Sequence, residues 1–539
     1  MLVSVGQSLR EIAAPFVVAP PAGRRIRTRL RPTAGEERAL WALGAHLGSL
    51  AGRDLTERCR LGRGDAQRAR RKQELTAESS SRWAGAITRT SNDQWQRAWL
   101  NLLDRRRGLR RALATIDRRL SAPVGGRNEK TGVHGYASRA DRFHKQQRRQ
   151  ILAARLAAVD ARIAEGRVSV VRGGRRLAST RHHLKDARLT EREWRERWHA
   201  ERMFITADGE RCKRHGNETI RIDPTTGIVE VKLPGVFAEH ASVKDGRLRL
   251  AVPVAFRHRA DKWAAQAQTG AVRYDIVHDP DRKRWYLDAS WRIAVGEPVT
   301  VAQATRHGVL ALDLNAGHLA CCALESAGNP TGQPFTVPIV DEGATGLRDA
   351  SIRHAISTLI HHAKTAGVQA IAVENLNFVD ARDTGRETMG RGKRGKRFRK
   401  TVAGLPTARF RDRLAHMCAS AGLRVIAVDP AYTSRWGAQH WQRPISTKTF
   451  KASRHHAASV TIGRRARGLG VRRGRRRDLL ASGASPRESC PGRTPSTTCA
   501  PAPRHDGKAT ARHPKVRKTR LGDPATVRGS PPSTVRSGR

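Results

Sequence analysis

The chain has 539 residues, of which 103 are Lys or Arg and 48 are Asp or Glu, so its formal net charge at pH 7 is +55. This excess is far larger than solubility requires, and it makes a polyanion the expected partner. The sequence contains no apolar stretch long enough to span a bilayer, which favours nucleic acid over a membrane and predicts a cytoplasmic protein. Its seven cysteines include no Cys-x-x-Cys pair, which argues against a disulfide framework and against a zinc site.

The first elements are predicted to be one strand and then helices. Residues 24–31 alternate Arg with Ile, Thr and Leu, as in a half-buried strand with a basic outer face. Apolar residues then recur at steps of three or four in residues 95–120 and again in residues 152–163. A glycine-rich loop separates the two segments, so we expect an antiparallel helical hairpin with arginine-rich outer faces.

The pattern changes to short strands with turn signals between them. These strands are expected at residues 168–171, 219–222, 228–233, 248–254, 272–277 and 285–291. A small, mostly antiparallel barrel would satisfy this pattern. Together with the strand at 24–31, it would be one wedge-like barrel interrupted by the helical region.

From His307 onward, strands and helices alternate in the order β-β-β-α-β-α-β. The expected elements are strands 308–314, 319–324 and 335–340, a helix 346–366, a strand 368–374, a helix 405–421 and a strand 423–429. This order fits an RNase H-like sheet, in which the ends of the first and fourth strands lie side by side. The remaining segment, 464–539, has 20 Lys and Arg, 4 Asp and Glu, and no Phe, Trp or Tyr, so it is expected to be disordered.

The predicted fold class is therefore a multidomain α/β and α+β protein. We expect an N-terminal tail (1–23), a first barrel strand (24–33), a helical domain (34–165), a wedge-like β-barrel (166–300), an RNase H-fold domain (301–463) and a disordered basic tail (464–539).

Two carboxylates stand at the ends of apolar strands. Asp313 ends the run Gly-Val-Leu-Ala-Leu-Asp-Leu-Asn, and Glu374 ends a similar run, Ala-Ile-Ala-Val-Glu-Asn-Leu-Asn. Each acid alone would most simply cap its strand end. Two matched motifs, with suitable elements between them, favour a magnesium site instead, of the kind that hydrolyses phosphodiesters with two divalent ions.

Clusters of basic residues are the candidate nucleic-acid contacts. After Glu374, a glycine-containing loop carries Arg391, Lys393, Arg394, Lys396, Arg397, Arg399 and Lys400. A second cluster, in the predicted barrel, consists of Arg172, Arg175 and Arg176. Flexible cationic segments of this type can follow a phosphate backbone, although a solvated charge run has the same composition.

Three segments carry a family resemblance. Residues 308–320, 373–377 (Val-Glu-Asn-Leu-Asn) and 428–437 (Val-Asp-Pro-Ala-Tyr-Thr-Ser-Arg-Trp-Gly) resemble the OrfB/TnpB proteins of bacterial insertion sequences, which are relatives of type V CRISPR effectors. The resemblance spans most of residues 24–470. It implies a transposon-encoded, transposase-associated protein that uses a guide RNA to direct Mg²⁺-dependent cleavage of a DNA target by a RuvC-like domain. It would make Asp313 the first catalytic acid and Glu374 the second.

The chain departs from that family in two places. Where the family has Cys-x-x-Cys, this chain has Gly437-Ala-Gln-His, so a zinc ribbon is not expected. Where the family has its third acid, this chain has His455 and His456, which can ligate a metal but bring no negative charge. Asp429 is a further candidate that would partly compensate, although an Asp-Pro turn at a strand end is the simpler explanation for it.

The leading hypothesis is an RNA-guided DNA endonuclease. The two histidines and the missing cysteines motivate an alternative, a catalytically impaired guide-dependent DNA-binding protein or repressor. A general RNA-binding protein is a third alternative. The sequence leaves the guide, the target motif and the oligomeric state open.

Overall fold

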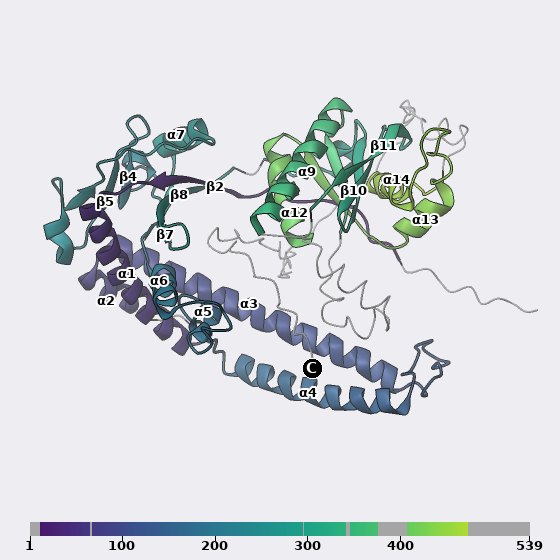
Figure 1. Ribbon diagram of the computed structural model, residues 1–539, viewed down its shortest axis with the longest axis horizontal. Helices are drawn as coiled ribbons and strands as arrows, with labels where there is room; N and C mark the ends of the chain where they lie inside the picture. The colour runs from purple at the N-terminus through teal and green to yellow at the C-terminus, as the bar shows by residue number, and fades with distance from the viewer. Residues whose placement is uncertain (1–10, 65–66, 295, 341–344, 376–406, 473–539) are drawn as a thin grey trace, which may run out of the picture. The chain divides into compact units, whose positions relative to one another are not determined.

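The computed structural model describes two compact units of the chain (Figure 1). One unit lies within residues 22–294; the other contains the described residues 11–21, 296–340, 345–375 and 407–472, and the pair 65–66 is not described. The chain is thus a mixed α/β protein with more than one domain. Within these ranges, no helix is both long enough and apolar enough to cross a membrane.

The first unit contains the expected helical hairpin among its helices. The long helices are α1 (Ala34–Arg60), α3 (Ser81–Leu120) and α4 (Arg139–Ala164), and the short ones are α2 (Arg68–Glu78), α5 (Arg175–Thr180), α6 (Glu191–Arg202) and α7 (Ala260–Thr269). Helices α3 and α4 lie side by side (Figure 1), and Trp95 and Leu102 of α3 are buried against Val159 of α4. The strand predicted at 168–171 is wrong, because Val168 joins this interhelical cluster and the segment has no strand pairing.

The strands of the first unit form two antiparallel sheets. The four-stranded sheet has the order β2 (Gly23–Leu30), β8 (Arg284–Arg292), β7 (Arg273–Asp279) and β3 (Thr206–Ala207); the three-stranded sheet has β4 (Ile220–Ile222), β5 (Val229–Lys232) and β6 (Arg247–Arg249). Both sheets share one hydrophobic core with α1 and the start of α3. Among the described residues, the strands therefore make two sheets around one core rather than the single barrel that was expected. Strands of two or three residues, such as β3, β4 and β6, offer too few hydrogen bonds to close a barrel.

A buried acid of β8 is paired with two arginines of β2. Asp288 is fully buried in the middle of β8, opposite Arg27 in the strand register. Its carboxylate accepts hydrogen bonds from Arg27 Nε at 2.6 Å and from Arg25. Two of the arginines that gave β2 its basic pattern therefore neutralise an acid on the neighbouring strand.

The second unit contains a six-stranded sheet with the strand order β1-β13-β12-β9-β10-β11. Its strands are β9 (Val309–Asn315), β10 (His318–Leu324), β11 (Pro330–Pro338), β12 (Ala370–Glu374), β13 (Arg424–Val428) and β1 (Phe16–Val17). Strands β9, β10 and β11 pair antiparallel, whereas β12 pairs in parallel with both β9 and β13. This is the arrangement predicted for an RNase H-like sheet. The pairing of β1 with β13 was missed, since residues 1–23 were expected to be a tail.

Helices cover both faces of this sheet. On one face, α9 (Thr345–Thr365) and α12 (Thr407–Ser420) pack on Leu310 and Leu312 of β9; on the other face, α14 (Arg454–Ala466) packs on Val309 and Ala311. Because side chains alternate along a strand, Asp313 falls on the α14 face. The remaining helices of this unit are α13 (Thr433–His440) and α8 (Val301–Ala304). The first unit also contains short 3₁₀ segments at Arg214–Gly216 and Gly235–His240.

The segment Gly437-Ala-Gln-His, where no zinc ribbon was expected, is part of helix α13. A side chain at Gly437 would have its Cβ only 2.6 Å from the backbone oxygen of Ala457 in α14. Gly437 therefore permits the close approach of α13 and α14. The predicted boundary of the basic tail, residue 464, was placed too early in the sequence. Arg464 and Arg465 are buried in the last turn of α14. The part of the predicted tail from residue 473 onward lies outside the described residues.

Candidate active site

Asp313 and Glu374 are brought together by the pairing of β9 with β12. Leu312 pairs with Val373 in the parallel register, and the two acids are the next residues along their strands. Both are almost fully buried, with exposed fractions of 5% for Asp313 and 7% for Glu374. The predicted juxtaposition of the two carboxylates is therefore present in the fold.

Glu374 is the acid whose protonation is most strongly perturbed. Burial raises the pKa of its carboxyl to about 7, and the neighbouring charge of Asp313 acts in the same direction. The hydroxyl of Thr433, at the start of α13, donates a hydrogen bond to Oε1 of Glu374 and opposes this rise. At neutral pH Glu374 is therefore close to half protonated, and a bound cation would favour its charged form.

Asp429 lies at the end of β13, next to the strand that carries Glu374, and is also buried. Its Oδ1 accepts a hydrogen bond from the backbone N–H of Ala431 at 2.9 Å, and its Oδ2 accepts one from Ala13 at 3.0 Å. The turn role expected for an Asp-Pro pair is thus present. The negative charge of Asp429 still contributes to the raised pKa of Glu374.

The two histidines of α14 have different surroundings. His455 Nδ1 lies 2.9 Å from Oδ2 of Asp313, so this histidine reaches the first carboxylate. His456 is turned elsewhere: its Nε2 lies 2.9 Å from the hydroxyl of Thr336, and its Nδ1 contacts Ser453, the N-cap of α14. Of the two candidates, the fold brings only His455 to an acidic side chain.

The same carboxylate also has a local partner. The amide of Asn315 donates to Oδ2 of Asp313 at 3.0 Å, from the end of the same strand. The ring of His318 lies near that of His455, with centroids 5.5 Å apart. Oδ2 of Asp313 is therefore contacted by side chains of both β9 and α14.

These side chains offer an incomplete metal-binding set. In the described part of the chain, no group of three or more His, Cys, Asp or Glu side chains is arranged to hold a metal ion. Asp313 and Glu374 are oxygen donors of the kind that Mg²⁺ prefers, whereas His455 is a nitrogen donor. The residues fit a single divalent ion shared by two carboxylates, and the further acids that a two-ion site needs are not found among them.

Arg465 of α14 was not predicted, although it lies at this site. Its side chain donates to the backbone carbonyls of Asp429 and, at 2.8 Å, Ala431. Burial lowers the pKa of Arg465, while the carboxylates of Asp429 and Glu374 oppose that change. This guanidinium therefore places positive charge beside Asp429 and Glu374.

The predicted nucleic-acid contacts are only partly described. Arg172 donates to the backbone carbonyls of Arg202 at 3.0 Å and Met203 at 2.7 Å, and burial lowers its pKa to about 10. Arg175 bonds to Ser169, whereas the side chain of Arg176 is exposed. The basic loop after Glu374 lies outside the described residues. Its candidate contacts are Arg391, Lys393, Arg394, Lys396, Arg397, Arg399 and Lys400.

Comparisons with known proteins give no family assignment. No family model and no curated protein matches the chain. The chain is similar to RuvC of T. thermophilus, solved in complex with a Holliday junction substrate, with 13% identity, a TM-score of 0.21 and coverage of 29% of this chain and 90% of that one. It is also similar to a protein in the cryo-EM structure of the CRISPR-Cas12f ternary complex, with 10% identity, a TM-score of 0.20 and coverage of 82% and 98%. Both TM-scores are too low to establish a shared fold, so the fold is assigned from the strand order.

Proposed function

We propose that this chain is a transposon-encoded, OrfB/TnpB-like protein that uses a guide RNA to bind DNA and a RuvC-like domain to cleave it. The observation that supports this best is the pairing of β9 with β12, which puts the buried carboxylates of Asp313 and Glu374 at adjacent positions. Two adjacent buried acids repel one another when both are ionised, and a divalent cation would offset that cost.

The cation would polarise the scissile phosphodiester and activate the attacking water. The chain's own residues prepare its binding. Thr433 donates a hydrogen bond to one oxygen of Glu374, and the positive charge of Arg465 favours the ionised form of Glu374. Because Glu374 has a pKa of about 7, cation binding would displace a proton and would strengthen as the pH rises through that value.

A second candidate function is guide-dependent DNA binding without cleavage. It is favoured by the contact of His455 with Asp313, because an imidazole occupies the neighbourhood where the related family has its third acid. In this case the chain would occupy its target as a repressor. The binding part of the proposal is common to both candidates and is supported by the net charge of +55.

The two candidates and the weaker alternative separate in one series of experiments. The protein is purified from its native host and the RNA that accompanies it is sequenced. A discrete RNA with a constant scaffold and a short variable end supports guided binding, and it defines the DNA duplex to test. A heterogeneous mixture of RNAs would contradict guidance and leave a general RNA-binding protein. Tight binding of the matched duplex without any cleavage would favour the repressor.

A further inference from the structure

A hollow with positively charged walls lies on the three-stranded sheet of the first unit. Its volume is about 710 Å³. The cationic residues that line it are Arg214, Arg221, Lys244, Arg247 and Arg249. The acidic residues of its lining are only Glu230 and Asp245, so the lining has net positive charge. We call this feature the basic hollow.

The most informative residue of the basic hollow is Arg247 of β6. Its side chain is only 4% exposed. Its Nη2 donates to the backbone carbonyl of Glu218 at 2.7 Å and to Oε1 of the same residue at 2.8 Å. Its Nε and Nη1 are also buried, yet neither has a hydrogen-bond partner among the described residues. Buried guanidinium donors are ordinarily satisfied, so Arg247 has hydrogen-bonding capacity that the protein itself does not use.

A second guanidinium is held beside the first. Glu218 accepts a hydrogen bond from Arg221 of β4 as well as from Arg247, so a single carboxylate holds both arginines. The Nε of Arg221 is another buried donor without a partner in the described chain. Burial lowers the pKa of Arg247, and the nearby charge of Arg221 lowers it further. A bound anion would relieve this repulsion.

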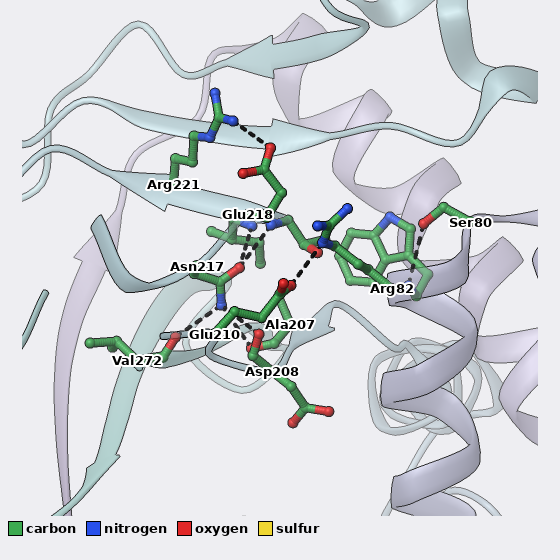
Figure 2. A network of polar contacts seen from close by, with 12 residues as sticks. Ser80, Arg82, Ala207, Asp208, Glu210, Asn217, Glu218, Arg221 and Val272 are labelled. Carbon is green, nitrogen blue, oxygen red and sulfur yellow. Dashed lines mark hydrogen bonds and ion pairs between the residues drawn. The ribbon is translucent and has the colours of Figure 1, made fainter. Parts of the chain in front are cut away.

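The base of this arrangement is rigid. Figure 2 shows Asn217 at the centre of a hydrogen-bond network, next to Glu218 and its bond to Arg221. Asn217 is fully buried, and its amide donates to the backbone carbonyl of Val272 at 2.9 Å. Its Oδ1 accepts from the N–H groups of Thr219 and Ile220, both at 2.9 Å. The network fixes the start of β4, and with it the position of Glu218, before any ligand binds.

We propose that the basic hollow is a binding site for a phosphate monoester or an oligophosphate group. Because Glu218 occupies Nη2 of both arginines, the buried donors left over are Nε and Nη1 of Arg247 and Nε of Arg221, each of which can donate one charge-assisted hydrogen bond to an oxygen of an anion. A volume of about 710 Å³ is within the range of small-ligand sites. The group belongs either to a free nucleotide or to the 5′ end of a polynucleotide. This site is separate from the carboxylates of the proposed nuclease and does not depend on their activity.

The test is metal-free pyrophosphate binding to the full chain, measured by isothermal titration calorimetry. Arg247→Lys keeps the charge and removes the unpaired Nε and Nη1 donors. The double variant Arg214→Ala/Lys244→Ala changes two exposed residues of the lining and leaves the buried network intact. The matched control is Lys185→Ala/Arg192→Ala, which removes the same charge at exposed positions outside the lining. We expect about tenfold weaker binding in both hollow variants and a change of less than about twofold in the control.

Equal affinity in the wild type, Arg247→Lys and Arg214→Ala/Lys244→Ala would overturn the proposal, as would an equal loss in the control. If Arg247→Lys does not fold by circular dichroism, the double variant decides alone. The source of the phosphate is read from RNA oligonucleotides of one sequence with a 5′-triphosphate or a 5′-hydroxyl. Tighter binding of the triphosphate, lost in the double variant, identifies a polynucleotide end. Equal binding of both RNAs, with pyrophosphate binding retained, identifies a free nucleotide.

Discussion

Replacing Glu374 with Gln should stabilise the second unit at alkaline pH in the absence of divalent cations. Burial and Asp313 raise the pKa of Glu374 from 4.5 to about 7. A carboxyl with a raised folded-state pKa binds a proton more tightly in the native state than in the unfolded state. The contribution of the Glu374 carboxyl to the free energy of unfolding is therefore largest below pH 4.5 and falls as the pH rises from 4.5 to 7.

The size of the effect follows from the shift. A rise in pKa from 4.5 to about 7 corresponds to about 3 kcal/mol of unfolding free energy above pH 7. The glutamine side chain of the Glu374→Gln variant would have nearly the same shape as the native side chain, would still accept the hydrogen bond from Thr433, and would have no charge to desolvate. The variant should gain about 3 kcal/mol over the wild type at pH 8 and almost nothing at pH 4.5.

The assay is hydrogen exchange in EDTA, followed by mass spectrometry on peptides that contain β9 and β12. It reports the free energy of opening of this unit alone, after correction for the intrinsic exchange rates. Glu297→Gln, at an exposed position, is the matched control and should have no effect at either pH. An equal difference between Glu374→Gln and wild type at pH 4.5 and pH 8 would refute the reasoning, because the carboxyl would then titrate normally in the folded protein.

Four further results are expected. In a cleavage assay, Thr433→Val removes the hydrogen bond to Glu374 and should move the acidic limb of the rate–pH profile to higher pH; an unchanged profile would show that Thr433 does not tune the acid. His455→Asp supplies a third carboxylate beside Asp313, so half-maximal Mg²⁺ binding by calorimetry should occur at a concentration about tenfold lower, and an unchanged affinity would sink the idea that the missing acid limits the site. Asp288→Ala leaves Arg25 and Arg27 without their shared acid and should destabilise the first unit by about 3 kcal/mol in urea denaturation, whereas exposed Asp281→Ala should cost less than about 0.5 kcal/mol. Gly437→Ala should also destabilise the second unit, because the new methyl group meets the backbone of Ala457; hydrogen exchange in α14 that matches the wild type would contradict this.

The strand order around the candidate site was predictable because each of its strands carries a local signal. The acids at 313 and 374 follow apolar runs, and parallel pairing of the first and fourth strands puts them together. The pairing of Phe16 and Val17 with β13 had no such signal, since two residues show no periodicity. The strand predicted at 168–171 failed for the opposite reason, because its alternating valines pack against helices.

The side chains around the two acids could not be chosen from the sequence. Thr433 is 59 residues from Glu374, and Arg465 is 36 residues from the carbonyl of Asp429, so these contacts exist only after the sheet and α14 have formed. Adjacent residues of a helix point about 100° apart, so only one of His455 and His456 faces Asp313. The packing of α14 on the sheet decides which one, and a single sequence does not specify that rotation.

The central claim is tested most directly by single-turnover cleavage of a DNA duplex matched to the RNA that accompanies the protein. The wild type is compared with Asp313→Asn, which keeps the shape of the side chain and removes its charge. The account predicts cleavage that requires Mg²⁺ and is lost in the variant, with DNA binding retained in both proteins. Binding without cleavage by the wild type, or equal cleavage by the two proteins, would contradict the assignment of Asp313 and Glu374 as the catalytic pair.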